Sequence, residues 1–121
     1  MTWRLMSAFD SLNQSPFDIL VVDDSHASLK LLVSILGKAG YRVCPANSGE
    51  LALRSVQAKL PSLILLDIKM PGLDGYEVCM RLKADEKTRS IPVVFTSALD
   101  NEADHVKGFE VGGEIRHGHH P

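Results

Sequence analysis

The sequence predicts an α/β domain in which a parallel β-sheet carries helices on both faces. Short apolar runs rich in β-branched residues alternate with longer stretches whose apolar residues recur every three or four positions, which is the pattern of βαβ units. The runs at 19–22 and 63–66 are apolar throughout, which favours central strands covered on both sides. A chain of 121 residues is long enough for one such core and too short for two.

Local signals along the chain place each element. Strands are expected at 19–22, 41–44, 63–66 and 91–95. Helices are expected where apolar residues have helical spacing, over 29–36, 51–60, 76–82 and 106–111. Gly37 and Gly40 stop the first helix, Ser48 is the expected N-cap of the second, and Pro61 ends it. The fourth helix is expected to begin near Asp100.

Composition excludes several classes of function. The formal net charge of -2 provides no basic surface for nucleic acid, so no direct contact with DNA or RNA is expected. No apolar run approaches the roughly 20 residues that cross a bilayer, so we expect no membrane contact and a cytoplasmic location. The two cysteines, Cys44 and Cys79, lie in apolar patterns and are predicted to be buried, reduced thiols.

Residues 1–16 are expected to form an extension ahead of the domain. The apolar residues of this segment are Trp3, Leu5, Met6, Phe9 and Leu12. Asp10 and Asn13 interrupt them, so no signal-peptide core forms. The segment is either a short amphipathic helix that packs on a partner or a leader outside the fold, and we favour the leader.

Polar residues follow three of the predicted strands. The strand at 19–22 ends in Asp23-Asp24, the strand at 63–66 in Asp67, and the strand at 91–95 in Thr96-Ser97. Ligands of open α/β sheets bind beyond the carboxyl ends of the strands, so these side chains are expected to meet at one edge. Clustered carboxylates repel one another, and Mg²⁺ relieves the repulsion because it prefers oxygen ligands.

Each of these residues has a simpler interpretation when it is taken alone. Asp24, or more plausibly Ser25, could cap the helix that follows. Asp74-Gly75 is expected to serve turn chemistry, and Ser97 could satisfy a backbone group at a strand end. Carboxylates and a hydroxyl at the ends of several strands of one parallel sheet nevertheless favour the functional interpretation.

Three segments resemble bacterial receiver domains of two-component response regulators, of the chemotaxis-regulator type. They are Val21–Ser25, Leu65–Gly75 and Ile91–Ala98. The middle segment is highly specific, with an apolar strand, Asp, two residues, Met-Pro-Gly, one residue and Asp-Gly. The resemblance covers about Asp18 to Gly113, so 17–113 is the expected domain. It implies the flavodoxin-like, doubly wound fold with strand order 2-1-3-4-5.

The resemblance also implies a role for each site residue. Asp67 matches the phosphoacceptor, Asp24 the direct Mg²⁺ ligand, and Asp23 its partner, which binds the metal through water. The backbone carbonyl of Lys69 matches the position that completes the metal ligands. Ser97 matches the hydroxyl that bonds a phosphoryl oxygen. In this interpretation Asp67 accepts a phosphoryl group from a sensor histidine kinase, a phosphotransfer protein or a small phosphodonor.

The implied function is signalling rather than enzymatic turnover, apart from slow self-dephosphorylation as a reset. Phosphorylation is expected to switch a surface that a downstream effector domain or protein binds. The kinase and the output stay open, as does whether the parent is a response regulator or a hybrid kinase. A haloacid-dehalogenase-like phosphatase is rejected, because that family needs an Asp where this chain has Lys69.

The sequence departs from the family after Gly113. Residues 114–121 form an atypical tail in which Arg116 stands at the position of an aromatic switch residue, and His119-His120 stand at the position of Lys-Pro. This tail resembles vector-derived sequence more than a metal site. The fifth strand and last helix are therefore expected to be missing or altered, and without the lysine phosphorylation is expected to be impaired. An interaction-only pseudo-receiver is the alternative function.

Loss of the fifth strand would also leave the fourth strand as an unpaired apolar edge, a surface that natural proteins cover. We therefore expect a homodimer, a domain swap or aggregation through that edge, unless residues of the tail still form a short strand.

Overall fold

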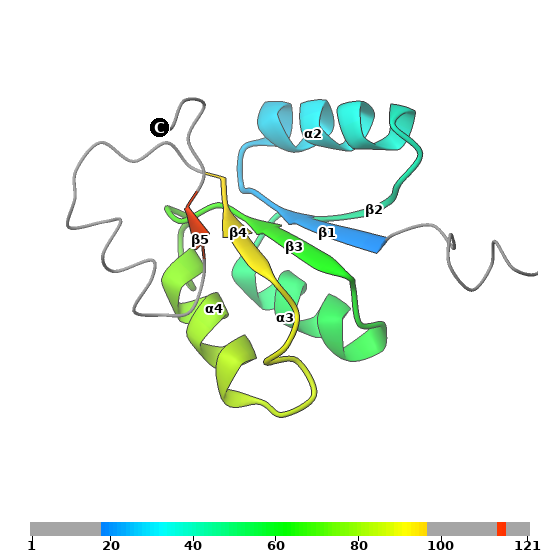
Figure 1. Ribbon diagram of the computed structural model, residues 1–121. Coiled ribbons are helices and arrows are strands. Elements are labelled where there is room, and N and C mark those ends of the chain that lie inside the picture. Colours follow the sequence, from blue (N-terminus) through cyan, green and yellow to red (C-terminus); the bar gives the residue numbers. More distant parts are fainter. Residues whose placement is uncertain (1–17, 97–113, 116–121) are drawn as a thin grey trace, which may run out of the picture.

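The computed structural model describes residues 18–96 and 114–115. Within these residues, five parallel strands form one sheet in the order β2-β1-β3-β4-β5. The strands are β1 (Asp18–Val22), β2 (Arg42–Ala46), β3 (Leu63–Leu66), β4 (Val93–Phe95) and β5 (Glu114–Ile115). The described helices are α2 (His26–Lys38), α3 (Gly49–Ala58) and α4 (Gly75–Ala84). Helix α2 lies on one face of the sheet, and α3 and α4 lie on the other (Figure 1).

The predicted α/β class and the strand order are confirmed. The observed strands differ from the predicted ones by one or two residues at their ends, apart from β3, which is the same. Strand β2 extends through Pro45, which an edge strand tolerates because one side of its backbone needs no hydrogen-bonded partner. Strand β4 begins only after Pro92, whose carbonyl still accepts a hydrogen bond from the Ile64 amide at 3.0 Å.

The fifth strand is present, in a very short form. Glu114 and Ile115 pair in parallel with Val94 and Phe95. The fifth strand is therefore altered rather than missing, and the edge of β4 is paired at two residues, which is the exception that the prediction allowed. We expected a homodimer, a domain swap or aggregation only if this edge were unpaired, and Val94 and Phe95 are paired with β5. The expected fourth helix and residues 116–121 lie outside the described residues.

The main core lies between the sheet and the two helices α3 and α4. Alternate strand residues point to this side, as the two-residue period of a strand requires. The strand residues of this core are Leu20, Val22, Ile64, Leu66, Val93 and Phe95. Helices α3 and α4 contribute Ala52, Val56, Val78 and Leu82. Tyr76 packs edge-on against Phe95, with ring centroids 5.5 Å apart, at the end of the sheet where the acidic residues lie.

Side-chain caps begin all three described helices. The Ser25 hydroxyl accepts a hydrogen bond from the Ser28 amide at 3.3 Å, so Ser25 rather than Asp24 is the cap of α2. Ser48 caps α3, as predicted. The prediction that Asp74 serves only a turn is wrong, because its carboxylate caps α4 by accepting from the Glu77 amide at 2.9 Å. None of the helices in the described part is long and apolar enough to span a bilayer.

The two thiols differ in their surroundings. Both cysteines are free, but only Cys79 is buried, so the prediction of burial is wrong for Cys44. Cys44 lies on the edge strand β2, where no described neighbour covers it. Burial raises the pKa of the Cys79 thiol to about 11, which keeps it protonated and unreactive at neutral pH.

Candidate functional site

The sheet brings three predicted site residues together. Val22 and Leu66 are partners in the β1–β3 pairing, so the next residues, Asp23 and Asp67, leave the sheet side by side. The Asp67 amide donates to the Val22 carbonyl at 2.9 Å, which extends the pairing to this residue. One carboxylate oxygen from each of Asp23, Asp24 and Asp67 lies within 4.8 Å of the other two. The predicted meeting of these carboxylates is therefore observed.

The three carboxylates differ in exposure. Asp23 is 8% exposed, Asp67 is half-buried and Asp24 is exposed. Asp23 is also held on two sides, because its Oδ1 accepts from the Ser25 amide at 2.8 Å and its own amide donates to the Ala46 carbonyl at 3.1 Å. The cluster is therefore fixed at its inner end and open to solvent at Asp24.

Like charges this close oppose one another. Two unit charges 4.8 Å apart repel by about 1 kcal/mol in water and by about 3–4 kcal/mol at an effective dielectric constant of ~20. Among the described residues, the carboxylates that form ion pairs are those of Asp18 and Glu77, and neither Asp23 nor Asp24 is among them. A bound divalent cation would relieve this repulsion, and an all-carboxylate donor set suits a hard ion that prefers oxygen. The cluster can therefore bind a metal.

Gly75, the first residue of α4, lies against the backbone of Asp67 and Ile68. The Gly75 amide donates to the Ile68 carbonyl at 2.8 Å, so the first residue of α4 sits against the turn after β3. A Cβ at Gly75 would overlap the Asp67 carbonyl oxygen and lie 2.8 Å from the Ile68 Cα. Only glycine allows this approach. The Asp-Gly pair at the end of the Leu65–Gly75 motif is the sequence signal for this approach, beyond the turn chemistry predicted for it.

The other two predicted site residues are Lys69 and Ser97. Lys69 is exposed, and the role of its backbone carbonyl stays a prediction. Ser97 lies outside the described residues. Its neighbour Thr96 donates its amide to the Leu66 carbonyl at 3.0 Å, so the chain leaves β4 beside the residue that precedes Asp67.

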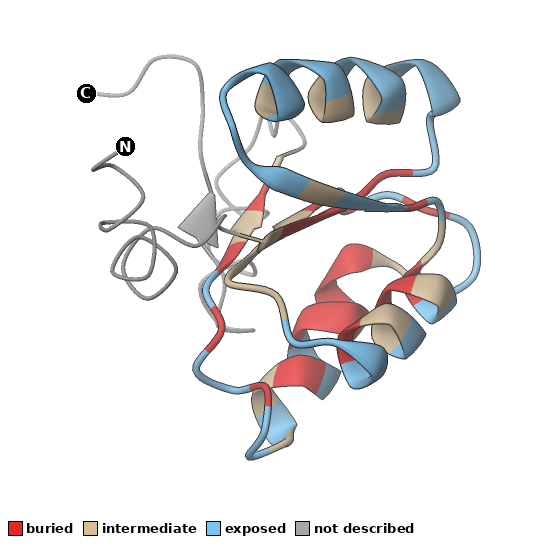
Figure 2. Cartoon of the chain, turned by 90° about the vertical axis from the view of Figure 1, so that its right-hand side faces the viewer, coloured by how far each residue is buried: buried red, intermediate tan, exposed pale blue. Residues whose placement is uncertain are grey.

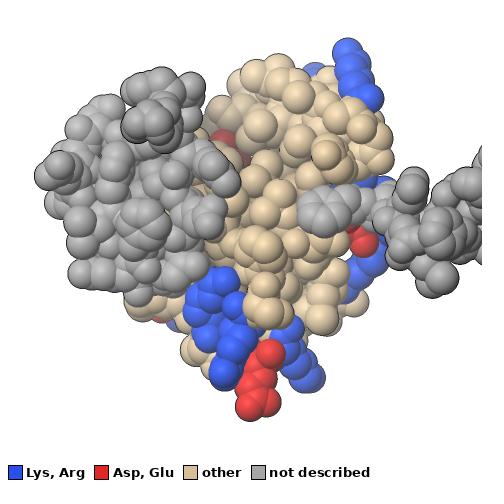
Figure 3. Space-filling view, viewed as in Figure 1, with Lys and Arg blue, Asp and Glu red and all other residues tan. Residues whose placement is uncertain are grey.

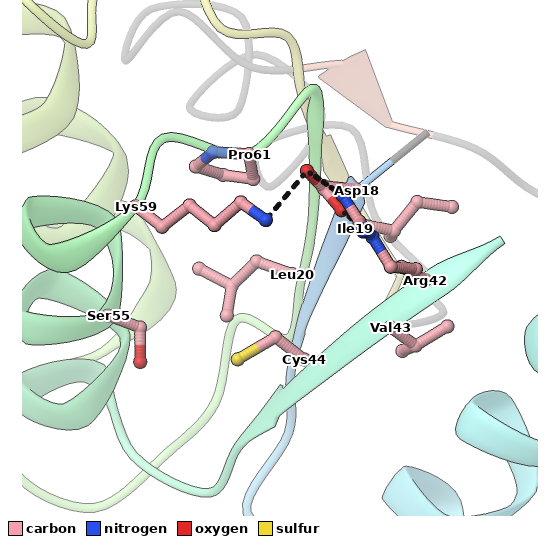
Figure 4. A pocket seen from close by; sticks show the side chains of 9 residues that line it. All are labelled: Asp18, Ile19, Leu20, Arg42, Val43, Cys44, Ser55, Lys59 and Pro61. Atoms are coloured by element: carbon pink, nitrogen blue, oxygen red, sulfur yellow. Dashed lines mark hydrogen bonds and ion pairs between the residues drawn. The ribbon is translucent and has the colours of Figure 1, made fainter. Parts of the chain in front are cut away.

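A separate pocket of about 240 Å³ lies at the other end of β1 (Figure 4). The Asp18 carboxylate there accepts from the Arg42 guanidinium at 2.8 Å and lies 3.4 Å from the Lys59 Nζ. The hydrogen bond from Arg42 lowers the pKa of Asp18. Asp18 begins β1 and Asp23 follows its end, so this pocket is remote from the carboxylate cluster. We therefore assign it no part in the metal site.

Comparison with known proteins settles the family. The model of the response regulator receiver domain matches residues 19–114, which is most of the chain. The chain therefore belongs to the response regulator receiver domain family. It is accordingly a receiver domain of the two-component signalling class, as its motifs predicted.

Individual receiver proteins resemble the chain over most of its length. It is 48% identical over 94 residues to the response regulator PleD of Caulobacter vibrioides and 41% identical over 96 residues to the transcriptional regulatory protein PhoP of Bacillus subtilis. These matches cover 78% and 79% of the chain, but only 21% and 39% of the relatives. The receiver domain thus spans between a fifth and two fifths of these longer proteins.

Solved receiver domains have the same fold. The N-terminal domain of a response regulator receiver protein from Methanoculleus marisnigri is 39% identical, with a TM-score of 0.74 and coverage of 81% and 80% of the two chains. The receiver domain of a histidine kinase from Syntrophus aciditrophicus is 35% identical, with a TM-score of 0.75 and coverage of 81% and 74%. Receiver domains like this one therefore occur both in response regulators and in a histidine kinase.

Proposed function

We propose that this receiver domain accepts a phosphoryl group on the carboxylate of Asp67, with Mg²⁺ held by Asp23, Asp24, Asp67 and the backbone carbonyl of Lys69. The donor is a sensor histidine kinase or a phosphotransfer protein. The observation that carries the proposal is the meeting of Asp23, Asp24 and Asp67 within 4.8 Å at the carboxyl ends of β1 and β3.

The chemistry follows from the placement of these groups. A carboxylate oxygen of Asp67 attacks the phosphorus of a phosphohistidine, an acyl phosphate forms, and the P–N bond to the imidazole breaks. Mg²⁺ supplies neutralisation of charge on the phosphoryl oxygens. Asp23 is held by the Ser25 amide and so keeps its carboxylate beside Asp67. Exposed Asp24 lies on the solvent side, from which a donor reaches the cluster.

The signalling step is part of the same proposal. A hydroxyl at Ser97 bonds a phosphoryl oxygen and draws the segment after β4 toward the site. The surface that this segment forms then favours a downstream effector domain or protein, and slow hydrolysis of the acyl phosphate resets it. The names of PleD and PhoP, a response regulator and a transcriptional regulatory protein, support an effector in the longer parent. The location consistent with this role is the cytoplasm.

One feature of the sequence favours a second candidate, an interaction-only receiver with impaired phosphorylation. Residues 114–121 contain no lysine, and His119-His120 stand where the family has Lys-Pro. The lysine that, in the family, would pair with the bound phosphoryl group is therefore absent from this stretch.

Incubation with acetyl phosphate and Mg²⁺, followed by intact mass measurement, tests the proposal. We expect the mass to rise by one phosphoryl group, and we expect Asp67→Asn to lose this adduct. The matched control is Glu86→Gln, which removes an exposed carboxylate elsewhere and should leave the adduct unchanged. An adduct that persists in Asp67→Asn would refute the site. No adduct on the unaltered chain, while another receiver domain is phosphorylated in parallel, would favour the interaction-only function.

A further inference from the structure

The pocket at the start of β1 lies on the side of the sheet that faces α3. Leu20 and Cys44 are partners in the β1–β2 pairing, and both line the pocket together with Ser55 of α3. Figure 4 shows Lys59, at the end of α3, reaching over Leu20 toward Asp18. The pocket is therefore bordered by two strands and the last turn of a helix.

Two small side chains account for this space. Ser55 on α3 and Cys44 on β2 line the pocket at positions where larger apolar side chains would fill it. Strand β2 is the edge of the sheet, and Figure 2 shows that it is exposed for most of its length. Four further lining residues are apolar, namely Ile19, Leu20, Val43 and Pro61.

The volume of the pocket sets the size of a ligand. Its volume of about 240 Å³ exceeds the roughly 150 Å³ of an engineered protein cavity that binds benzene. Drug-sized ligands occupy larger pockets, of about 300–1,000 Å³. The pocket therefore suits a single ring, or a branched aliphatic group of that size, with one polar substituent.

The charged side chains of the lining set the sign of the ligand's charge. The lining contains two cations, Arg42 and Lys59, and one carboxylate, Asp18, so one positive charge is in excess. The side chains of Arg42 and Lys59 are 56% and 65% exposed, which leaves both accessible. Figure 3 shows basic side chains beside an acidic one at the edge of the molecule where β1 begins. The lining therefore favours an anion.

Hydrogen-bond donors also exceed the acceptors that Asp18 provides. A guanidinium has five N–H donors and an ammonium group has three. Arg42 contacts Asp18 through Nε at 2.8 Å and through Nη2 at 3.4 Å, so its Nη1 side can still form a planar pair with another carboxylate. A phosphate monoester carries about −1.5 to −2 charges at neutral pH, which is more than the single excess charge. A carboxylate matches this charge better.

We propose that this pocket binds a small organic carboxylate. The apolar body of the ligand contacts Leu20 and Cys44. Its carboxylate group accepts hydrogen bonds from Arg42 and Lys59. The site lies at the opposite end of β1 from the carboxylate cluster, so it does not depend on the proposed phosphorylation.

NMR titration of the full, nitrogen-15-labelled chain without Mg²⁺ tests the proposal, with benzoate as the probe. We expect saturable shifts of the Leu20 and Cys44 amide signals, with a Kd on the order of 1 mM. Benzamide has the same ring and no charge, so it should bind about fivefold more weakly. Arg42→Gln should likewise weaken benzoate binding about fivefold, because it removes one cation. The matched control is Arg54→Gln, which removes an exposed cation of α3 outside the lining and should leave the Kd unchanged.

A filled pocket tests the space rather than the charge. Ser55→Leu should occupy the pocket and abolish the saturable shifts. Cys44→Leu serves the same purpose if circular dichroism shows that Ser55→Leu does not fold. Saturable binding of benzoate to a folded, filled variant would overturn the proposal. So would equal Kd values for benzoate and benzamide, equal effects of Arg42→Gln and Arg54→Gln, or the absence of any saturable shift.

Asp67→Asn separates this proposal from the proposed phosphorylation. The substituted chain should bind benzoate as tightly as the unaltered chain does, whether or not the unaltered chain is phosphorylated. Loss of benzoate binding in Asp67→Asn would place the anion at the carboxylate cluster and would overturn the assignment to this pocket.

Discussion

The replacement of Gly75 by alanine tests how the backbone of Asp67 is positioned. The added Cβ would overlap the Asp67 carbonyl oxygen and would lie 2.8 Å from the Ile68 Cα and 3.0 Å from the Asp67 carbonyl carbon. These are backbone atoms at the end of a paired strand, so no side chain can rotate to make room. The start of α4 and the turn after β3 must therefore separate.

The energetic cost follows from the contacts that this separation disturbs. Overpacking a closed site typically costs about 1–3 kcal/mol. Separation also strains the hydrogen bond from the Gly75 amide to the Ile68 carbonyl, at 2.8 Å, and such a bond contributes about 1 kcal/mol. We therefore expect Gly75→Ala to lower the free energy of unfolding by about 2–4 kcal/mol, measured by urea denaturation followed by circular dichroism.

A second glycine provides the matched control. Gly37 also lies in a helix, but a Cβ there would meet nothing within 4 Å. Alanine is the better helix former, so Gly37→Ala should raise the free energy of unfolding by roughly 0.5–1 kcal/mol. The two substitutions thus have opposite expected signs. Equal or greater stability of Gly75→Ala relative to the unaltered chain would refute the close approach of α4 to Asp67.

Three further predictions concern charge and capping. Asp24→Asn should raise the thermal midpoint without metal, because it removes a repulsion of about 1 kcal/mol or more. Mg²⁺ at ten times its Kd should raise the free energy of unfolding of the unaltered chain by roughly 1.4 kcal/mol, and Asp24→Asn should abolish this increase. A Mg²⁺ effect that survives in Asp24→Asn would argue against the cluster as the metal site. The pKa of Asp18 is lowered, so its pairing with Arg42 stabilises the fold above the unfolded pKa and is lost as the pH falls through the folded pKa. Arg42→Ala should therefore lower the free energy of unfolding only slightly at pH 7 and leave it unchanged in strong acid, and an effect that grows on acidification would contradict the pairing. Asp74→Ala should cost about 1 kcal/mol in urea denaturation through loss of the α4 cap, whereas Asp74→Ser should retain most of it.

Local patterns predicted most of the sheet and two of the caps. Strand β3 was predicted without error because all four of its residues are apolar, although only Ile64 and Leu66 are fully buried. The N-cap role of Ser48 was likewise predicted, since hydroxyl caps act within one turn. The convergence of Asp23 and Asp67 also followed, because any parallel pairing of their strands brings their carboxyl ends together.

The sequence-based predictions were wrong or incomplete where contacts with residues distant in sequence determine burial, strand pairing or capping. Cys44 has an apolar local pattern, yet it is exposed because β2 is the edge strand, and strand order is invisible in that pattern. Strand β5 has two residues and no apolar run, so its pairing with β4 leaves almost no signal. Asp74-Gly75 suits both a turn and a helix start, and only the approach of α4 to Asp67 distinguishes them.

The position of Asp67 depends on two contacts of its backbone. The pairing of β1 with β3 brings Asp67 beside Asp23, and Gly75 lets the first residue of α4 approach the Asp67 carbonyl. Because the backbone of α4 thus lies against the proposed phosphoacceptor, a substitution that moves the start of α4 should disturb the site as well as the fold. Gly75→Ala should therefore lower both the thermal midpoint and the phosphorylation of the folded domain.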